Sequence, residues 1–321
     1  MSKKVAVLTS GGDAPGMNPC IRACVRFGLY KGLEMYGVQR GYQGLVDDDI
    51  FEMNSRSVSD IIQRGGTMLK SARCAEFRTM EGMEKAYNNL KKRDISQVIC
   101  IGGDGTFTGA KIMSDNFDIS VMGIPGTIDN DLAYTDFTLG FDTAVNTVLW
   151  AINSLRDTMG SHDRCAILQV MGRHCGDIAL YAGLCGGAEY ILVPEVPYDL
   201  DKIASSLRHA RERGKTSNML IFAEGAGNIE EITEYLNEKA GVKISITTLG
   251  HIQRGGSPTM QDRVLASKFG ERAIELIMLG AADRVIGIRD NKIIDENISE
   301  ALEMERKFDK KLYKLAEIMS L

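Results

Sequence analysis

The sequence has little of what marks membrane or nucleic-acid-binding proteins. No apolar run in its 321 residues approaches the ~18 residues that a membrane-spanning helix needs. The apolar stretch at the N-terminus is too short for a signal peptide. Neither sign of charge is in large excess, since the net charge is −5. We therefore expect no membrane partner and no nucleic-acid partner.

Cysteine and histidine are also sparse in the patterns that bind metals or form disulfides. The chain has 7 cysteines, an odd number, and none of them form a C-x-x-C pair. The 4 histidines show no metal-ligand spacing. These patterns favour reduced thiols in a cytoplasmic protein over a disulfide framework or a zinc site.

Short apolar runs alternate with amphipathic stretches along the chain. Runs without internal alternation, each followed by a helix, are typical of a mostly parallel sheet that is covered on both faces. The length predicts two lobes, because single cores stop growing near ~250–300 residues. The charged tail Glu300–Lys307 is expected to be helical and mostly solvated. The predicted strands are Val5–Thr9, Gln97–Ile101, Ser120–Ile124, Cys165–Met171, Tyr190–Val193, Met219–Ala223 and Ile244–Leu249. The predicted helices are Met17–Leu29, Glu81–Lys92, Thr106–Met113, Asp142–Arg156, Asp177–Leu184, Asp199–Arg213, Ile229–Ala240 and Asp262–Leu279.

Glycine is abundant, with 34 residues, and it clusters where predicted strands end. Ser10–Asn18 is a strand-to-helix turn with paired glycines, which suits phosphate binding at a helix N-terminus. It has neither the Rossmann G-x-G-x-x-G spacing nor the lysine of a P-loop. Gly102–Thr106 has the same context, and Asp104 within it can reach a hydrated Mg²⁺. Such a motif also occurs in NAD kinases and lipid kinases, so it leaves the substrate open.

Pro125–Asp131 places two carboxylates, Asp129 and Asp131, just after a predicted strand. A turn is one interpretation, because Asp, Asn and Gly are turn residues. Phosphoryl transfer is the other, since it needs a carboxylate to accept the proton of a hydroxyl and another to handle the metal. The glycine turns at the ends of neighbouring strands favour the second interpretation.

Further polar groups follow other predicted strands. Arg173 lies in the loop Met171–Asp177, and Glu224 follows Met219–Ala223. The segment Leu249–Pro258 sets His, Gln and Arg between glycines, which offers donors for a sugar phosphate. Each such residue taken alone is more often structural or solvated. Binding and catalytic residues are, however, common in loops at strand ends.

The segments SGGDAPGMN, GGDGT, PGTIDND, MGRHCGD and GHIQRGGSP occur in this order. Together they resemble the bacterial ATP-dependent 6-phosphofructokinases, across nearly the whole chain and more weakly after about Ile286. The resemblance implies an α/β fold of two similar Rossmann-like lobes, each a mostly parallel sheet flanked by helices. It implies an ATP-binding lobe of residues 1–138 with 251–300, and a sugar-phosphate lobe of residues 139–250 with 301–321.

The resemblance also implies a cytoplasmic homotetramer that transfers the γ-phosphoryl of ATP, with Mg²⁺, to the 1-hydroxyl of fructose 6-phosphate. It assigns catalysis to Asp129 as the base, with Thr127, Asp131 and Arg173. It assigns the nucleotide to Gly12, Arg73, Cys74, Gly103, Asp104, Gly105 and Thr106, with Asp104 as the metal ligand. It assigns the sugar phosphate to Thr127, Asp129, Arg164 of a neighbouring subunit, Met171, Gly172, Arg173, Glu224, His251 and Arg254. It assigns an ADP or phosphoenolpyruvate effector to Arg22, Arg26, Arg156, Glu189, Arg213 and Lys215.

Glycine at two positions favours ATP over pyrophosphate as the donor. Pyrophosphate-using relatives tend to carry Asp at position 105 and Lys at position 126, where this chain has Gly105 and Gly126. Bulk and charge there would fill the space of the ATP α-phosphate.

Two positions depart from the family pattern. Ser245 replaces an arginine that reaches the 6-phosphate across subunits, with Lys243 nearby, and Ser55 replaces an effector arginine. The identity of the sugar therefore stays open, and a kinase for another sugar phosphate is an alternative. A non-catalytic regulatory paralogue is a further alternative, although the expected catalytic groups are all retained.

Overall fold

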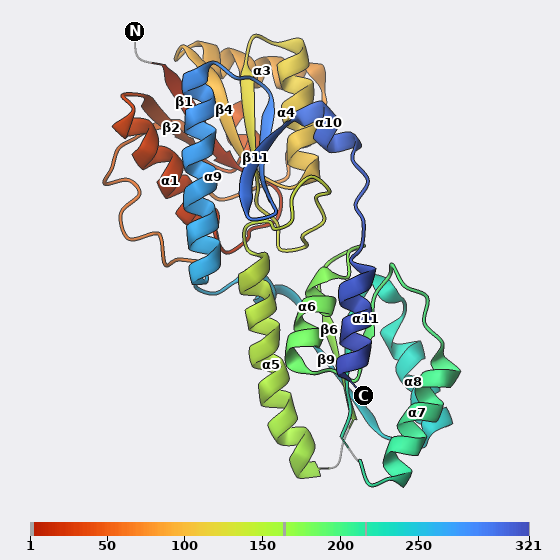
Figure 1. Cartoon of the computed structure of the whole chain (residues 1–321). Helices are drawn as coiled ribbons and strands as arrows, with labels where there is room; N and C mark the ends of the chain where they lie inside the picture. The colour runs from red at the N-terminus through yellow and green to blue at the C-terminus, as the bar shows by residue number, and fades with distance from the viewer. Residues whose placement is uncertain (1–2, 163–164, 216, 321) are drawn as a thin grey trace. The chain divides into compact units, whose positions relative to one another are not determined.

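The structure is a computed structural model that describes residues 3–162, 165–215 and 217–320, without the side chain of residue 162. Figure 1 shows the chain divided into two compact units. The first unit holds Met1–Ile128, Leu132–Thr143 and Arg254–Arg306, and the second holds Asp129–Asp131, Ala144–Gln253 and Lys307–Leu321. The chain therefore changes unit at residues 143/144, 253/254 and 306/307, where the family pattern placed the changes at 138/139, 250/251 and 300/301. The short excursion Asp129–Asp131 has no counterpart in that pattern.

The first unit is built on a seven-stranded sheet in the order β11-β10-β5-β4-β1-β2-β3. Strands β1, β2, β4, β5 and β10 run parallel to one another, and the edge strands β3 and β11 pair antiparallel with β2 and β10. The strands are β1 (Lys4–Thr9), β2 (Glu34–Val38), β3 (Ile50–Met53), β4 (Ile95–Gly102), β5 (Ser120–Pro125), β10 (Arg284–Arg289) and β11 (Lys292–Asn297).

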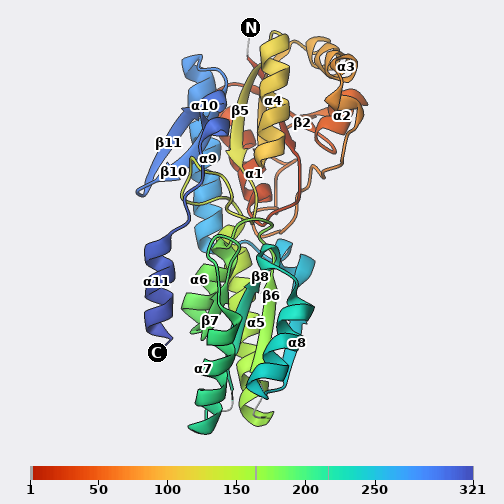
Figure 2. The same ribbon diagram turned by 90° about the vertical axis from the view of Figure 1, so that its right-hand side faces the viewer.

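Helices cover both faces of this sheet. Figures 1 and 2 show α1 (Met17–Tyr30) and α9 (Met260–Leu279) side by side on one face. These two helices pack so closely that a Cβ at Gly270 would lie 2.6 Å from the Cβ of Ala23. Leu8, Val98 and Phe107 belong to the core on the opposite face. The helices of that face are α2 (Tyr42–Val46), α3 (Met80–Lys91), α4 (Asp104–Asn116) and α10 (Ile298–Glu303).

The second unit has a four-stranded, fully parallel sheet in the order β7-β8-β6-β9. Its main core joins one face of the sheet to α7 and α8, through residues such as Leu207, Phe222 and Leu236. On the other side, α6 packs against α11, whose Tyr313 hydroxyl donates to the carbonyl oxygen of Ile191 at 2.9 Å. The elements are β6 (Cys165–Val170), β7 (Tyr190–Leu192), β8 (Met219–Ala223), β9 (Ile244–Thr248), α5 (Phe141–His162), α6 (Asp177–Gly186), α7 (Leu200–Glu212), α8 (Ile229–Ala240) and α11 (Lys310–Met319).

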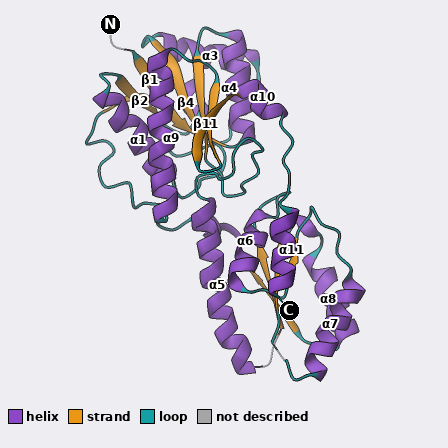
Figure 3. Ribbon diagram, in the orientation of Figure 1, coloured by secondary structure: helices purple, strands orange, loops and turns teal. Residues whose placement is uncertain are grey.

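The predicted fold class is confirmed, since each unit is a mostly parallel sheet between helices (Figure 3). The strands β2, β3, β10 and β11 were missed, because β2 and β3 are short, β10 begins and ends with arginine, and β11 has three charged residues. The prediction that the tail is helical through Lys307 is wrong. Helix α10 ends at Glu303, and Met304 is extended with a ψ of 134°. Ile298 and Ala301 are buried, but the side chains from Glu303 to Glu305 are exposed, so no packing stabilises a further turn.

None of the helices in the described ranges is long and apolar enough to cross a membrane.

Candidate active site

The loop after β1 turns into α1 through glycines with left-handed backbone. Gly11 has a φ of +85° and Gly16 a φ of +116°, conformations that side chains with a Cβ rarely adopt. A Cβ at Gly12 would lie only 2.0 Å from Nη1 of Arg254, so the guanidinium of Arg254 lies directly against this loop. The same Nη1 donates to the carbonyl oxygen of Asp13 at 3.4 Å. Glycine at position 12 thus leaves the room that a cationic side chain occupies.

The loop after β4 lies beside it at the same edge of the sheet. The backbone N–H of Ser10 donates to the carbonyl oxygen of Ile101 at 3.0 Å, which joins the ends of β1 and β4. A Cβ at Gly102 would lie 2.4 Å from Oγ1 of Thr106, so the first turn of α4 folds closely over the strand end. The Tyr42 hydroxyl fixes this turn by donating to the carbonyl oxygen of Thr106 at 2.5 Å.

Asp104 and Gly105 form the exposed start of α4. A Cβ at Gly105 would meet nothing within 4 Å, so open space lies in front of the helix N-terminus. The carboxylate of Asp104 also affects a buried residue, Tyr134. Burial first, and the Asp104 carboxylate second, raise the pKa of the Tyr134 hydroxyl well above its usual value.

The end of β5 completes the glycine-rich edge. The Gly126 N–H donates to the carbonyl oxygen of Gly102 at 2.9 Å. A Cβ at Gly126 would lie 2.9 Å from a methyl carbon of Ile101, so this glycine is packed, in contrast to Gly105. A Cβ at Gly103 would lie 3.9 Å from the Cβ of Thr127, which places Thr127 beside the loop after β4.

Arg73 and Cys74 were both assigned to the nucleotide. Arg73 is exposed and Cys74 is half-buried. The Cys74 sulfur accepts a hydrogen bond from the N–H of Phe77 at 3.4 Å. Phe77 in turn stacks on Tyr42 with ring centroids 4.0 Å apart, so Cys74 is connected to the residue that fixes Thr106.

The residues at this edge fit a Mg²⁺ ion that is held mainly by substrate phosphates. Within the described ranges no three His, Cys, Asp or Glu side chains gather into a site that could hold a metal alone. Mg²⁺ keeps several waters and takes one or two carboxylates together with phosphate oxygens. Asp104, exposed beside open space at Gly105, supplies one such carboxylate.

Asp129 and Arg173 form the charged pair of the second unit. Asp129 is only 2% exposed, and its Oδ2 lies 3.5 Å from Nε of Arg173. Arg173 has a left-handed φ of 53° and leaves 65% of its side chain exposed. A buried carboxylate therefore faces a cation that remains accessible to a ligand.

Side-chain oxygens from three other segments of the chain hold the loop that carries Arg173. The N–H of Met171 donates to Oε1 of Gln253 at 3.2 Å, and the N–H of Arg173 donates to Oε1 of Glu224 at 2.9 Å. The N–H of Gly176 donates to Oε1 of Glu195 at 2.9 Å. Glu224, assigned from the sequence to the sugar, thus also contacts the loop backbone. The sequence had indicated Gln253 only as a donor for a sugar phosphate, not as an acceptor for this loop, and it had indicated no role for Glu195.

Sequence reasoning also missed the pair Asn130 and Asp177, both of which are buried. Nδ2 of Asn130 donates to Oδ2 of Asp177 at 2.8 Å. The motifs PGTIDND and MGRHCGD each contained one member, but nothing in the sequence showed that they meet. Asp131, two residues after Asp129, is half-buried.

The residues assigned to the 6-phosphate fall in different places. His251 is exposed in the 3₁₀ helix Gly250–Arg254 and belongs to the second unit. Arg254 belongs to the first unit, where it contacts the loop after β1. Ser245 is exposed on the edge strand β9, and Lys243 is exposed just before it. Arg164 lies outside the described residues.

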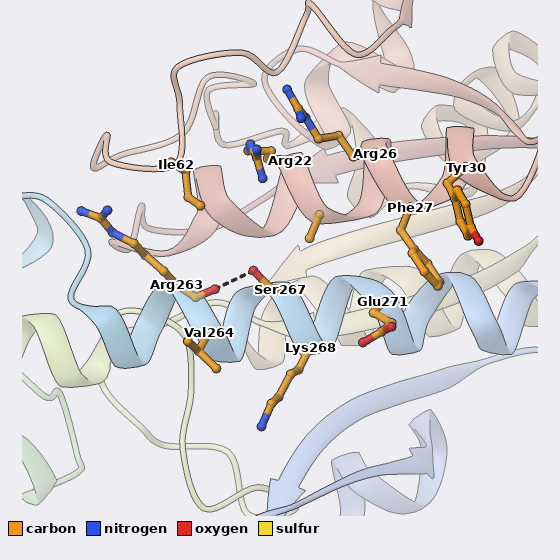
Figure 4. A pocket seen from close by; sticks show the side chains of 11 residues that line it. Arg22, Arg26, Phe27, Tyr30, Ile62, Arg263, Val264, Ser267, Lys268 and Glu271 are labelled. Carbon is orange, nitrogen blue, oxygen red and sulfur yellow. Dashed lines mark hydrogen bonds between the residues drawn. The ribbon is translucent and has the colours of Figure 1, made fainter.

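The structure groups the residues assigned to an effector into two sets. In the second unit, Glu189 accepts from Nζ of Lys215 at 2.9 Å and lies 4.0 Å from Nη2 of Arg156, while Arg213 is exposed nearby in sequence. In the first unit, Arg22 and Arg26 line an open hollow between α1 and α9 (Figure 4). Burial, and then the charge of Arg26, lower the pKa of Arg22. This hollow is also lined by Arg263 and Lys268.

A family model described as phosphofructokinase matches residues 4–277, which is well over half of the chain. The chain belongs to the phosphofructokinase family. Among curated relatives, the ATP-dependent 6-phosphofructokinase of Clostridium botulinum (strain Hall) is 56% identical over 318 residues, covering 99% of both chains. The protein of the same description from Clostridium tetani is also 56% identical with the same coverage.

Solved structures of the family have the same fold. A phosphofructokinase from Saccharomyces cerevisiae matches 99% of this chain with a TM-score of 0.91 and 33% identity. This chain spans only 47% of the length of that yeast chain. A pyrophosphate-dependent phosphofructokinase from Marinobacter aquaeolei has a TM-score of 0.85 at 22% identity, which shows a shared fold alone.

Proposed function

We propose that this protein is an ATP-dependent 6-phosphofructokinase, which transfers the γ-phosphoryl of ATP to the 1-hydroxyl of fructose 6-phosphate. The observation that carries the proposal is the 56% identity, over 99% of both chains, to proteins of that description. The buried Asp129 beside the accessible Arg173 supports it, because the reaction needs a base for a hydroxyl and a cation for developing phosphoryl charge.

The residues of the first unit serve the nucleotide in this proposal. The glycine loops after β1 and β4 give phosphate oxygens access to backbone N–H groups at the start of α1 and α4. Asp104 would hold Mg²⁺, which when bound would supply positive charge to the phosphates. Arg73 and Cys74 also bind the nucleotide in this proposal, and open space at Gly105 leaves room for a nucleoside triphosphate rather than pyrophosphate.

The residues proposed for the sugar phosphate belong to the second unit, except Thr127 and Arg254, which belong to the first. Asp129 accepts the proton of the 1-hydroxyl, and Arg173 stabilises the negative charge that spreads over the transferring group. Met171, Gly172 and Glu224 hold the sugar, while His251 and Arg254 receive its 6-phosphate. Thr127 and Asp131, on either side of the base, complete the reacting end.

The assembly and regulation of the enzyme are part of the same proposal. A cytoplasmic homotetramer would let Arg164 of a neighbouring subunit contribute to the 6-phosphate. The group formed by Arg156, Glu189 and Lys215, together with Arg22, Arg26 and Arg213, would serve an ADP or phosphoenolpyruvate effector.

One assay tests the activity and the open question of the sugar together. Purified protein is given Mg²⁺ and ATP with fructose 6-phosphate, tagatose 6-phosphate or sedoheptulose 7-phosphate, and ADP formation is followed. We expect fructose 6-phosphate to have the highest kcat/KM, and pyrophosphate to be a poor donor under the same conditions. A higher kcat/KM with another sugar, or equal turnover with pyrophosphate, would contradict the proposal.

A further inference from the structure

Asn130, the residue between the two site carboxylates, has an unusual backbone conformation. Its φ is 52°, in the left-handed region that residues with a Cβ enter at a cost, although Asn tolerates it better than most. Since Asp129 is the residue just before it, the conformation of Asn130 helps to set the direction in which the Asp129 carboxylate points.

A buried hydrogen bond holds Asn130 in this conformation. Its side-chain amide donates to Oδ2 of Asp177 at 2.8 Å, and the two residues are 5% exposed each. The thiol of Cys175 adds a weaker contact, 3.9 Å from the carbonyl oxygen of Asn130. Both the side chain and the backbone of Asn130 therefore contact the segment Cys175–Asp177, where α6 begins.

Asp177 is well placed to act as a charged acceptor. It is the first residue of α6, a helix of 10 residues, where the helix dipole favours a carboxylate. Hydrogen bonds to an ionised acceptor are roughly twice as strong as those between neutral groups. Because both residues are buried, such a bond holds Asn130 firmly in its conformation.

The same loop meets the Asp129–Asn130 segment a second time. Arg173, four residues before Asp177, brings Nε to 3.5 Å from Oδ2 of Asp129. The side chain of Arg173 is 65% exposed, whereas the bond from Asn130 to Asp177 is buried. The buried contact thus holds the segment that carries Asp129 in place relative to the loop that carries Arg173.

We propose that Asp177 is a positioning residue for phosphoryl transfer, which acts through Asn130 to hold the Asp129 carboxylate in its reactive orientation. This inference rests on the phosphofructokinase activity proposed above. Asp177 contacts neither substrate in this role. The alternative is that Asp177 serves only the stability of α6, in which case its loss would affect unfolding and leave kcat unchanged.

The test compares Asp177→Ala and Asp177→Asn with Asp199→Ala, a matched control in the same unit. Asp199 is the N-cap of α7 and accepts from the N–H of Lys202 at 3.1 Å, so its loss shows what helix support alone contributes. We expect Asp177→Ala to lower kcat by about 10- to 100-fold, the scale of a small misplacement of a reacting group. KM for ATP should be unchanged. Asp177→Asn keeps an acceptor oxygen and should retain more of the activity, while Asp199→Ala should lower Tm only.

Exchanging the two side chains tests the interaction between Asn130 and Asp177 separately from the contribution of each residue. Asn130→Asp alone sets two carboxylates against each other and should reduce kcat at least as far as Asp177→Ala. The double variant Asn130→Asp with Asp177→Asn restores a hydrogen bond of reversed direction and should recover about tenfold in kcat. The carboxylate at position 130 is the same in both proteins, so recovery reports the interaction between residues 130 and 177 and not the charge at position 130 alone. A double variant no better than Asn130→Asp would overturn the proposal.

A crystal structure of Asp177→Ala gives a reading that does not depend on turnover. The proposal requires residue 130 to leave its left-handed conformation, or Asp129 to lose its contact with Arg173. An unchanged backbone and contact would overturn it even if the wild-type protein phosphorylated none of the sugars. Wild-type inactivity in the assay above would count against the proposed function alone.

Discussion

The loops after β1 and β4 in the first unit and the loop after β6 in the second unit are all assigned to the active site, but they are built differently. At Gly105 the first unit offers a position where a Cβ would meet nothing within 4 Å. The loop after β6 instead has the N–H groups of Met171 and Arg173 bonded to Gln253 and Glu224. The proposed nucleotide site thus has open space at Gly105, whereas the backbone of the loop after β6 is held by side chains. Substitutions should act through size and local charge in the first case, and through geometry in the second.

The largest expected effect is the loss of the base in the second unit. Asp129→Ser should lower kcat by at least ~10²-fold, the usual scale for losing general base catalysis, while ATP binding changes little. Steady-state kinetics and a nucleotide-binding measurement check both parts. Asp118→Ser, which changes an exposed carboxylate of the first unit, serves as the control. Retention of more than a tenth of the wild-type kcat would show that Asp129 is not the base.

The next effect tests whether the second unit lacks one cation for the 6-phosphate. Ser245→Arg should lower KM for fructose 6-phosphate roughly ten- to a hundred-fold, since a charge-assisted hydrogen bond contributes ~1.5–3 kcal/mol. KM for ATP should stay the same. Ile246→Arg is the control, because adjacent residues of β9 point to opposite faces.

Lys243→Ala distinguishes compensation from loss at the same place. If Lys243 already serves the phosphate, its removal raises KM for the sugar and Ser245→Arg changes little. If neither variant alters that KM, residues 243–245 do not face the phosphate.

A smaller effect is expected from charge in the open space of the first unit. Gly105→Asp should raise KM for ATP about tenfold, because a carboxylate would lie close to phosphate oxygens. The fold should tolerate it, since acidic residues are favourable in the first turn of a helix such as α4. Gly105→Ala adds a methyl group without charge and should stay near wild type. Equal effects of the two substitutions would mean that size, and not charge, limits the site.

The smallest effect concerns a buried carboxylate of the first unit that has no catalytic role. Asp262 is 1% exposed and accepts from the N–H groups of Gly140 and Thr143 and from the Thr143 hydroxyl. Burial raises its pKa to about 6, although these hydrogen bonds lower it in part. The folded protein therefore binds the proton more tightly than the unfolded chain. Acidification through about 6 should then stabilise the fold, and this gain is lost as the pH rises again.

Thermal unfolding of wild type and Asp262→Asn at several pH values measures this contribution. The wild type should gain about 1 kcal/mol relative to the variant between about pH 7 and pH 5. Asp118→Asn, at an exposed position, should show no such change relative to wild type. Parallel curves for wild type and Asp262→Asn would contradict the expectation.

Much of the fold could be predicted because its strands are plain apolar runs. Met219–Ala223 is β8 to the residue, and all five of its side chains are buried. The strand β11 was not predicted, because Lys292–Asn297 has only two apolar residues and lies at a sheet edge. Edge strands are half solvated, so their sequences resemble those of loops. The helix predicted for Glu300–Lys307 was too long for a related reason, since charge and propensity cannot show where packing ends.

The sequence by itself determined the chemistry that is available: glycine turns after strands, the acids of PGTIDND, and the arginine of MGRHCGD. These are local features, and each is complete within a few residues. Only the tertiary structure decided that Asn130 meets Asp177, that Glu195 and Gln253 hold the loop of Arg173, and that Arg254 lies against Gly12. Each of these contacts joins residues that are distant in the chain. The hydrogen-bond partner of a residue depends on which segments the sheet brings together. The sequence of either segment alone does not identify that partner.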